Sequence, residues 1–498
     1  MAYCGYVTTL KNVRKHPNAD RLLLAECFGN TVSVNLDYFE GQKGVYFPTD
    51  GQLSVEFCKH NNLVRKKNEA GENIGGYMDP DKRNVKTIKL RGEMSDGLFL
   101  PMTCLDFCFE DGNADAHLSI GDTIDVVNGH EICKKYIPRR NPSKSHGNGG
   151  NKTRKHKVDI APLFAEHADT AQLAYNLSAF KPGDEVEITL KMHGTSQRTG
   201  HLPVITDYAA PQMAFDILER KFIFKLFKPT KKMIEWAESK LTPIYDWGYV
   251  SGTRRVVLDT YDGGFYGSNH FREQHHNAFV GKLWKGETVY YEVVGFMDTG
   301  APIMAECSND RVNDKAFKKK WGKTTIFSYG CDPNGIKAGE IFKFETNPAN
   351  DKEGRLIMAP QSDIYVYRMT MTNEDGEVVE YTPDFMRYRC EQMGVKTVPV
   401  MWKGIVPEDG CWETDDDNEV IAISAGEWVR NKAERFYAGA DPIGKTHIRE
   451  GIVARIINRP KFTAFKHKNE EFKIIEGIVK DTAEAPDIEE AQEVELDN

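Results

Sequence analysis

Apolar and polar residues alternate with the period of β-strands at many places along this 498-residue chain. In its larger C-terminal part, strand-like segments lie at residues 186–191, 289–295, 364–370, 451–457 and 462–468. In the first of these, apolar Val186, Ile188 and Leu190 alternate with polar residues that end at Lys191, as in a half-buried strand. Lys191 is therefore expected to leave the sheet on its polar face, just before a turn at Gly194.

Helical segments are fewer and do not alternate regularly with the strands. Residues 424–427 (Ser-Ala-Gly-Glu) have capping-box spacing and predict a helix through about Ala438. Pro383 opens a short helix that Gly394 ends. Residues 213–241 have apolar and basic residues at helical spacing. The irregular order favours an α+β fold with antiparallel sheets over a Rossmann arrangement.

The N-terminal part is made of short strand-like segments bounded by Gly, Asp or Asn. They lie at Thr31–Leu36, Gly44–Pro48, Val85–Leu90 and Thr123–Val127. This spacing predicts a small closed β-barrel. We therefore expect a barrel module over residues 1–138 and a larger α+β domain over residues 158–480.

Charge is unevenly distributed along the chain, whose net charge is −9. The tail at residues 481–498 has eight acidic residues and no basic ones, which predicts disorder. Residues 139–157 have seven Lys or Arg and no acidic residue, among Pro, Gly, Ser and Asn. Such a segment is a flexible linker, which either binds a phosphate backbone or is only solvated. The candidate nucleic-acid contacts in it are Arg139, Arg140, Lys152, Arg154 and Lys155.

Composition limits the class of protein. Hydrophobic residues make up 40% and charged residues 28%, as in ordinary globular proteins of two to four domains at this length. No apolar run approaches the roughly 20 residues of a membrane helix, and the N-terminus lacks a signal-peptide pattern. The ten cysteines are scattered without a C-x-x-C pair, which favours reduced thiols. We expect a cytoplasmic protein, in a cell or a virus-infected host cell, with no membrane partner.

Lys191 belongs to the string Lys191-Met192-His193-Gly194. A lysine amine is a nucleophile when desolvation or nearby positive charge lowers its pKa. Alone, a lysine at a strand end is more often a surface residue. A nucleotide-binding function therefore requires partners elsewhere: cations for phosphate, carboxylates for metal or ribose, and an aromatic ring for the base.

Candidates for the first two roles lie on predicted strands. Lys466 and Lys468 fall on one strand face, about 7 Å apart, which suits a bound anion or a lysine-protected edge strand. Glu450 stands at the start of an apolar strand, where it is either a metal-binding carboxylate or a surface residue. Glu292 lies inside a hydrophobic strand, so it has either a ligand or a buried ion-pair partner.

The remaining candidates are aromatic residues and arginines. Tyr365 and Tyr367 share one strand face, which suits purine stacking or core packing. Arg254 and Arg255 follow a glycine turn, and guanidinium groups suit phosphate oxygens, although an exposed arginine pair is the simpler alternative.

In order, these motifs resemble those of the covalent nucleotidyltransferase superfamily, which contains ATP-dependent DNA ligases, RNA ligases and mRNA-capping enzymes. His193, followed by Thr195-Ser196, resembles the RNA-ligase branch, and residues 363–381 and 450–473 are similar to template-directed RNA ligases. In the N-terminal part, residues 16–22 and 90–98 resemble the OB module appended to some aminoacyl-tRNA synthetases. An OB module ahead of the catalytic domain resembles RNA ligases with N-terminal OB domains.

The resemblance implies an OB-fold barrel followed by a nucleotidyltransferase domain, with ATP and Mg²⁺ or Mn²⁺ as cofactors. It implies that Lys191 forms a covalent lysyl-AMP, which passes to an RNA 5′-phosphate before a 3′-OH seals the break. The implied nucleotide contacts are His193, Gly194, Arg254, Glu292, Tyr367, Glu450, Lys466 and Lys468, with Glu450 and possibly Glu292 at the metal.

The expected partner is RNA, as a nicked duplex, a broken strand, a tRNA or an RNA–DNA hybrid, bound by a monomer. Arg21 and Arg91 of the barrel would contact it, and the module should matter more for sealing than for lysyl-AMP formation. Arg198 and Arg255 are alternatives to Arg254, and Tyr329 to Tyr367. Residues 200–250 and 300–360 extend the domain without a predicted role. A DNA ligase, a capping-type enzyme and a non-catalytic RNA-binding protein remain alternatives.

Overall fold

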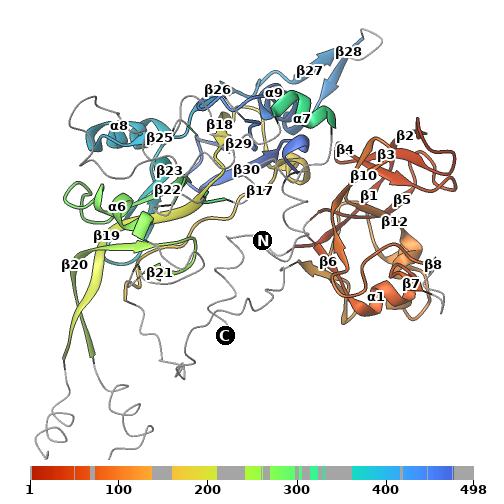
Figure 1. Cartoon of the computed structure of the whole chain (residues 1–498), viewed down its shortest axis with the longest axis horizontal. Coiled ribbons are helices and arrows are strands. Elements are labelled where there is room, and N and C mark those ends of the chain that lie inside the picture. Colours follow the sequence, from red (N-terminus) through yellow and green to blue (C-terminus); the bar gives the residue numbers. More distant parts are fainter. Residues whose placement is uncertain are drawn as a thin grey trace, which may run out of the picture.

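The computed structural model describes residues 3–49, 51–67, 73–136, 160–209, 242–258, 261, 270–297, 302–304, 315–322, 329, 331, 362–414, 419–445, 447–473 and 475 (Figure 1). The predicted helical segment 213–241, the basic linker and the acidic tail lie outside these residues. None of the described helices is long and apolar enough to cross a membrane.

The N-terminal part is built from short antiparallel strands. Its strands are β1 (Gly5–Thr9), β2 (Lys11–Lys15), β3 (Leu23–Cys27), β4 (Asn30–Val34), β5 (Lys43–Phe47), β6 (Gly51–Leu53), β7 (Lys66–Lys67), β8 (Asn73–Gly75), β9 (Asn84–Val85), β10 (Thr87–Leu90), β11 (Glu93–Asp96), β12 (Leu98–Pro101), β13 (Thr123–Ile124), β14 (Val126–Val127), β15 (His130–Glu131) and β16 (Cys133–Lys135). The helices are α1 (Val55–His60), the 3₁₀ helix η1 (Met102–Cys108) and α2 (Ala114–His117).

These strands form several small sheets around an apolar core. The main sheet has the order β12-β5-β1-β13, beside three-stranded sheets β2-β3-β4 and β16-β6-β9. Over the described residues the strand pairings do not close into one barrel. The four predicted strand segments are present, although the last two are each divided into two shorter strands. The closed OB barrel therefore stays a prediction.

The larger C-terminal part contains two large sheets and the two-stranded sheet β27-β28. The strands are β17 (Ala171–Gln172), β18 (Glu185–Lys191), β19 (Thr195–Ala209), β20 (Thr242–Gly252), β21 (Val257–Leu258), β22 (Glu287–Gly295), β23 (Ser362–Thr372), β24 (Val378–Glu380), β25 (Lys396–Thr397), β26 (Val400–Ile405), β27 (Cys411–Thr414), β28 (Val420–Ile423), β29 (Gly451–Ile456) and β30 (Thr463–Lys468). One sheet has the order β17-β30-β29-β18-β26, and the other has β21-β20-β19-β22-β23-β24, with β25 beside β23. Most pairings are antiparallel, as predicted, and β17–β30 and β23–β25 are parallel.

Helices accompany both sheets. They are the 3₁₀ helices η2 (Leu173–Tyr175) and η3 (Leu177–Ala179), and the α-helices α6 (His270–Asn277), α7 (Lys315–Trp321), α8 (Pro383–Met393) and α9 (Ala425–Tyr437). The predicted capping box of α9 is present: Ser424 and Glu427 bond each other's backbone N–H groups. The end of α8 is also as predicted, since Gly394 adopts the left-handed conformation.

One detail of the predicted alternation in β18 is wrong. Glu187, in the polar set of that strand, is only 3% exposed because α8 lies over it. Its carboxylate accepts two hydrogen bonds from Arg387 of α8, at 3.0 and 2.8 Å. A buried carboxylate is tolerated when it is paired in this way.

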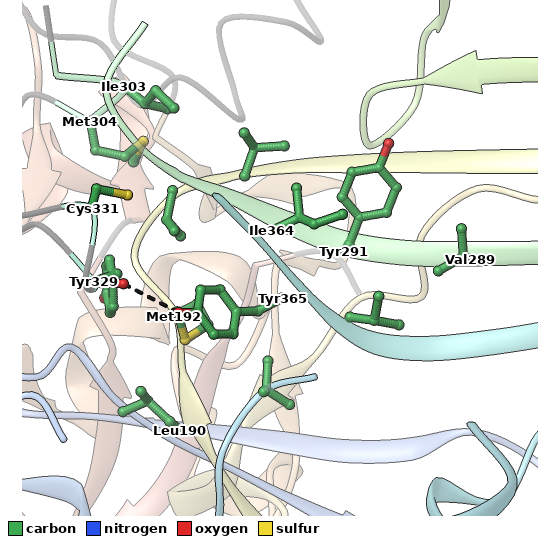
Figure 2. Packing of buried hydrophobic residues seen from close by; sticks show 14 of the residues in the cluster. Leu190, Met192, Val289, Tyr291, Ile303, Met304, Tyr329, Cys331, Ile364 and Tyr365 are labelled. Atoms are coloured by element: carbon green, nitrogen blue, oxygen red, sulfur yellow. Dashed lines mark hydrogen bonds between the residues drawn. The ribbon is translucent and has the colours of Figure 1, made fainter. Parts of the chain in front are cut away.

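The largest apolar core lies between the seven-stranded sheet and its helices, and contains Leu190 and Met192 on either side of Lys191. Figure 2 shows Met192 against the ring of Tyr365 in this cluster. All nine cysteines in the described residues are free thiols, and eight of them are buried, which agrees with the prediction from their spacing.

Candidate active site

Lys191 stands where the chain passes from one sheet to the other. β18 of the five-stranded sheet ends at Lys191, and β19 of the seven-stranded sheet begins at Thr195. The short loop between them therefore spans the junction of the sheets. Across the five-stranded sheet, Lys191 pairs with Gly451, and Gly451 pairs with Lys468. The two lysines thus occupy one row, separated by a residue without a side chain.

A buried carboxylate joins the predicted residues of this row. Glu450 Oε1 lies 2.7 Å from Lys191 Nζ and 3.6 Å from Lys468 Nζ. Its Oε2 lies 3.1 Å from His193 Nδ1. The Lys191 side chain is 24% exposed and that of Glu450 only 4%. A pair of predicted cations and a predicted carboxylate, distant in sequence, are therefore in direct contact.

The environment keeps Glu450 ionised. Burial alone would raise its pKa, but the charge of Lys191, the hydrogen bond from His193 and the charge of Lys468 outweigh it and hold the pKa of Glu450 well below its usual range. In turn, a carboxylate at 2.7 Å stabilises the ammonium form of Lys191.

Glycine is required at two positions around the loop by close backbone approach. A Cβ at Gly194 would lie 2.3 Å from the carbonyl oxygen of Val293. A Cβ at Gly451 would lie 2.2 Å from the carbonyl oxygen of His467. Both distances are shorter than any van der Waals contact, so a larger residue would push the loop or Glu450 out of place.

Lys466 and Lys468 are arranged as the strand pattern predicts. Both lie on β30, where Lys468 pairs with Gly451 and Lys466 with Val453, so they fall on the same face. Lys466 also pairs with Gln172 of β17. Lys466 therefore lies in the interior of the sheet, which excludes the alternative of an edge strand protected by lysines.

Glu292 lies next to the same loop, on β22. It pairs with Ser196 across the sheet and accepts a hydrogen bond from its hydroxyl at 3.2 Å. A fully buried arginine of α6, Arg272, donates to the Ser196 carbonyl at 3.0 Å and to Thr195 Oγ1 at 2.7 Å. Arg272, which the sequence pattern did not reveal, thus fixes Thr195 and Ser196 at the start of β19, directly after Gly194.

Arg254 and Tyr367 meet at a second cluster, around His167. The Tyr367 hydroxyl lies 2.6 Å from His167 Nδ1, and the backbone N–H of His167 donates to the Arg254 carbonyl at 3.3 Å. Arg254 bonds Asp169 at 2.5 Å. Burial, followed by the charges of nearby arginines, holds the pKa of His167 well below its usual range, so His167 is neutral.

β22 connects the two clusters, because Tyr290 of β22 packs edge-on against His167, with ring centroids 5.0 Å apart, two residues before Glu292. The register between β22 and β23 shifts near Tyr367: Tyr290 pairs with Arg368, and Tyr291 with Val366. His167 and Asp169 follow the predicted linker in the sequence. They belong to no motif or strand pattern that would have identified them as site residues.

Two other tyrosines approach the lysine loop more directly. The Tyr329 hydroxyl accepts a hydrogen bond from the His193 backbone N–H at 2.6 Å. The Tyr365 hydroxyl donates to the Tyr329 carbonyl at 3.2 Å, as the dashed line in Figure 2 shows. Tyr329 was an alternative to Tyr367 for base stacking, and the structure gives it a contact with the loop.

The two N-terminal strings that resemble an OB module lie side by side. His16 Nε2 lies 3.1 Å from the Leu90 carbonyl, and Asn18 Nδ2 donates to the Arg91 carbonyl at 2.9 Å. Arg21 and Arg91 are both exposed. The candidate contacts Arg139, Arg140, Lys152, Arg154 and Lys155 lie outside the described residues.

The residues fit a divalent cation that arrives with a nucleotide. The described residues contain no cluster of three or more His, Cys, Asp or Glu that would hold a metal by themselves. Glu450 is an ionised carboxylate next to two lysines that suit phosphate. Mg²⁺ is commonly held by one or two carboxylates together with substrate phosphates and water.

No protein-family model and no curated protein matches the chain. Solved structures of Naegleria gruberi RNA ligase are similar to it over most of its length. A mutant with ATP and Mn is 14% identical, with 94% of this chain and 98% of that chain covered and a TM-score of 0.48. The complex with PPi is 14% identical, with 94% and 97% covered and a TM-score of 0.47.

Proposed function

We propose that this protein is an ATP-dependent RNA ligase that joins 3′-OH and 5′-phosphate ends through a lysyl-AMP intermediate. The observation that carries the proposal is the contact of Lys191 with buried Glu450, beside His193 and Lys468. These residues, distant in sequence, are the ones that the ligase-like motifs single out.

In the first step, the Lys191 amine attacks the α-phosphorus of ATP, an N–P bond forms, and the bond to pyrophosphate breaks. The amine attacks after its ammonium proton has passed to solvent. Lys466 and Lys468 would neutralise charge on the α-phosphate, and their field opposes protonation of Lys191. Mg²⁺ or Mn²⁺, held by Glu450, would neutralise phosphate charge.

The two later steps use the same adenylate. An RNA 5′-phosphate oxygen attacks the lysyl-AMP phosphorus, which releases the Lys191 amine and leaves AMP joined to the 5′ end. A 3′-OH then attacks the 5′-phosphorus, and AMP leaves as the phosphodiester forms. Glu292 would bind the ribose, Arg254 the 5′-phosphate and Tyr367 the adenine, while Arg21 and Arg91 would contact the RNA strand.

The decisive experiment is incubation with α-labelled ATP and Mg²⁺ or Mn²⁺, followed by denaturing electrophoresis. Wild type should retain label, and Lys191→Met should not. Lys461→Met, which removes an exposed lysine just before β30, is the matched control and should label normally. No label on wild type, or equal label on Lys191→Met, would contradict the proposal.

The substrate is tested separately, with nicked duplexes that differ only in the sugar of the 3′-OH terminus. An RNA ligase should seal the nick with a ribose terminus and prefer ATP to GTP. Sealing that requires deoxyribose would indicate a DNA ligase, and labelling by GTP in place of ATP a capping-type enzyme. Tight RNA binding without label would indicate a non-catalytic RNA-binding protein.

A further inference from the structure

The N-terminal module is docked on the catalytic part through a buried ion pair. Lys473, five residues after Lys468, forms an ion pair with Asp96 at the end of β11. Their side chains are 17% and 7% exposed. The Asp96 carboxylate also accepts a hydrogen bond from the Thr87 hydroxyl at 2.6 Å. A pair this buried is sensitive to loss of one partner, because the other charge is left desolvated.

A second anchor lies directly beside this ion pair. Tyr175 of η2 stacks on Tyr6, with ring centroids 4.9 Å apart, and packs edge-on against Phe28 at 5.4 Å. Its hydroxyl lies 3.5 Å from that of Tyr46, which donates to the Asp96 carbonyl at 2.7 Å. Tyr46 therefore connects the two anchors.

Lys473 lies in the first turn of a helical segment that begins after Asn469, and this turn also contacts the candidate active site. The Asn469 backbone N–H donates to the Glu450 carbonyl at 2.8 Å, and the Lys473 N–H to the Asn469 carbonyl at 3.0 Å. Phe472 of the same turn is fully buried. Its ring packs edge-on against His193, with centroids 4.8 Å apart and planes at 73°.

Together these contacts form a continuous path to the nucleophile. Asp96 holds Lys473, Phe472 packs on His193, and His193 and Lys191 both contact Glu450.

We propose that Lys473 is a positioning residue for lysyl-AMP formation. The ion pair of Lys473 with Asp96 ties its helical turn to the N-terminal module and keeps Phe472 packed against His193. His193 in turn orients Glu450, which contacts Lys191. This inference rests on the proposed function. It gives the module a role in the first step, in addition to the RNA contacts expected from its sequence.

The expected loss of rate in a Lys473 variant follows from the cost of misplacing a reacting group. Without the ion pair, the turn gains freedom to move away from His193, and misplacement of a reacting group by about 1 Å costs up to roughly 100-fold in rate. We expect Lys473→Met to slow single-turnover lysyl-AMP formation by about tenfold while the KM for ATP changes little. The conservative Lys473→Arg should restore most of the rate, because it keeps the charge.

The experiment uses the full-length chain and five variants, one of which is the Lys473→Arg rescue. Asp96→Asn, Lys473→Met and their double mutant form a cycle, in which the double mutant should be no slower than the slower single mutant. Lys320→Met is the matched control. Lys320 lies on α7 and forms an ion pair at 3.0 Å with Glu471, which neighbours Phe472 in the same helical turn. The substitution therefore removes an ion pair of this turn that does not involve the N-terminal module. Thermal unfolding of each variant is followed in parallel.

Wild-type labelling rates for Lys473→Met would overturn the inference and leave the proposed function standing. The inference would also fail if Lys320→Met slowed labelling equally, or if the losses simply followed lowered unfolding temperatures. Additive effects of Asp96→Asn and Lys473→Met would show that the two residues act separately. Absence of label on wild type would instead remove the proposed function, and this inference with it.

Discussion

Glu450 is the residue on which the candidate site converges, since three predicted residues contact its carboxylate. Glu450→Gln keeps the shape of the side chain but removes the charge. We expect the rate of lysyl-AMP formation to fall by roughly 100-fold, as when a preorganised electrostatic contact is removed from a site. The measurement is single-turnover labelling with α-labelled ATP.

Glu408→Gln provides the control for this substitution, because Glu408 is exposed and distant from the loop in sequence. Its rate should equal that of wild type. A Glu450→Gln enzyme that labels within twofold of wild type would show that the carboxylate has no part in the first step.

At this scale the sequence predicts residue types and strand positions better than contacts. Lys191, Glu450 and Lys468 were each identifiable as strand-end charges, and the pairing of β18, β29 and β30 brings them together. Phe472 and Arg272 were not identifiable, because a phenylalanine or an arginine in a short helix has many possible partners until the tertiary packing is known. Their importance comes from packing, which one sequence does not encode locally.

Among the elements, β22 is held at its start by a buried ion pair. Arg389 of α8 makes two hydrogen bonds to Glu287, both 2.7 Å, and the side chains are 3% and 0% exposed. We expect Arg389→Met to lower the free energy of unfolding by about 3–5 kcal/mol, because it leaves a buried carboxylate without its cation. Urea denaturation measures the loss.

The paired replacement separates charge from packing. If the loss comes from the uncompensated carboxylate, Arg389→Met combined with Glu287→Leu should recover part of the stability. A double mutant less stable than Arg389→Met would show that the arginine acts mainly through its other contacts, such as its cation–π packing on Trp284 at 3.8 Å.

Helix ends and strand cores were the most predictable elements. The capping box of α9 and the Gly394 end of α8 rest on local hydrogen bonds and backbone preference, so few residues decide them. The burial of Glu187 was not predictable, because it depends on where α8 packs. Closure of the N-terminal barrel was likewise not predictable, because it depends on pairing between strands that are distant in sequence.

At the scale of the whole molecule, we expect the affinity for RNA to fall with rising salt concentration, because exposed arginines of the N-terminal module would contact phosphates. Arg21 and Arg91 are exposed residues of the two paired segments, 16–22 and 90–98. We expect Arg21→Ala and Arg91→Ala each to weaken binding of a nicked RNA duplex and to reduce the slope of log affinity against log salt by about 1. Fluorescence anisotropy across a salt series measures this.

Lys461→Ala supplies the comparison, as an exposed lysine on the catalytic part. If it lowers the salt slope as much as the two arginine variants, binding is spread over the surface and the module is not its centre.

Stability should also depend on pH, because several histidines are buried in the neutral form. Burial lowers the pKa of His275, His447 and His467 to about 4. The unfolded chain binds these protons near pH 6.5, and the folded chain only near pH 4. Each histidine therefore contributes stability that is complete above about pH 6.5 and is lost as the pH falls towards 4, by up to about 3 kcal/mol.

Urea denaturation at pH 7.0, 5.5 and 4.5 checks the sign: the free energy of unfolding should fall at each step. His275→Gln, which keeps a hydrogen-bonding group near Ser362, should show a smaller fall between pH 7.0 and 4.5 than wild type. Equal falls would mean that His275 is not held neutral.

The ion pair between Lys191 and Glu450 also has a consequence for chemical damage. Lysine amines react with acylating metabolites and cyanate only when they are unprotonated. As the proposed nucleophile, Lys191 in its ammonium form would therefore be shielded from these electrophiles until substrate arrives, even though its side chain is partly accessible to water. The contact with Glu450 that favours the unreactive ammonium form would thus also protect Lys191 from modification before the proposed reaction with ATP.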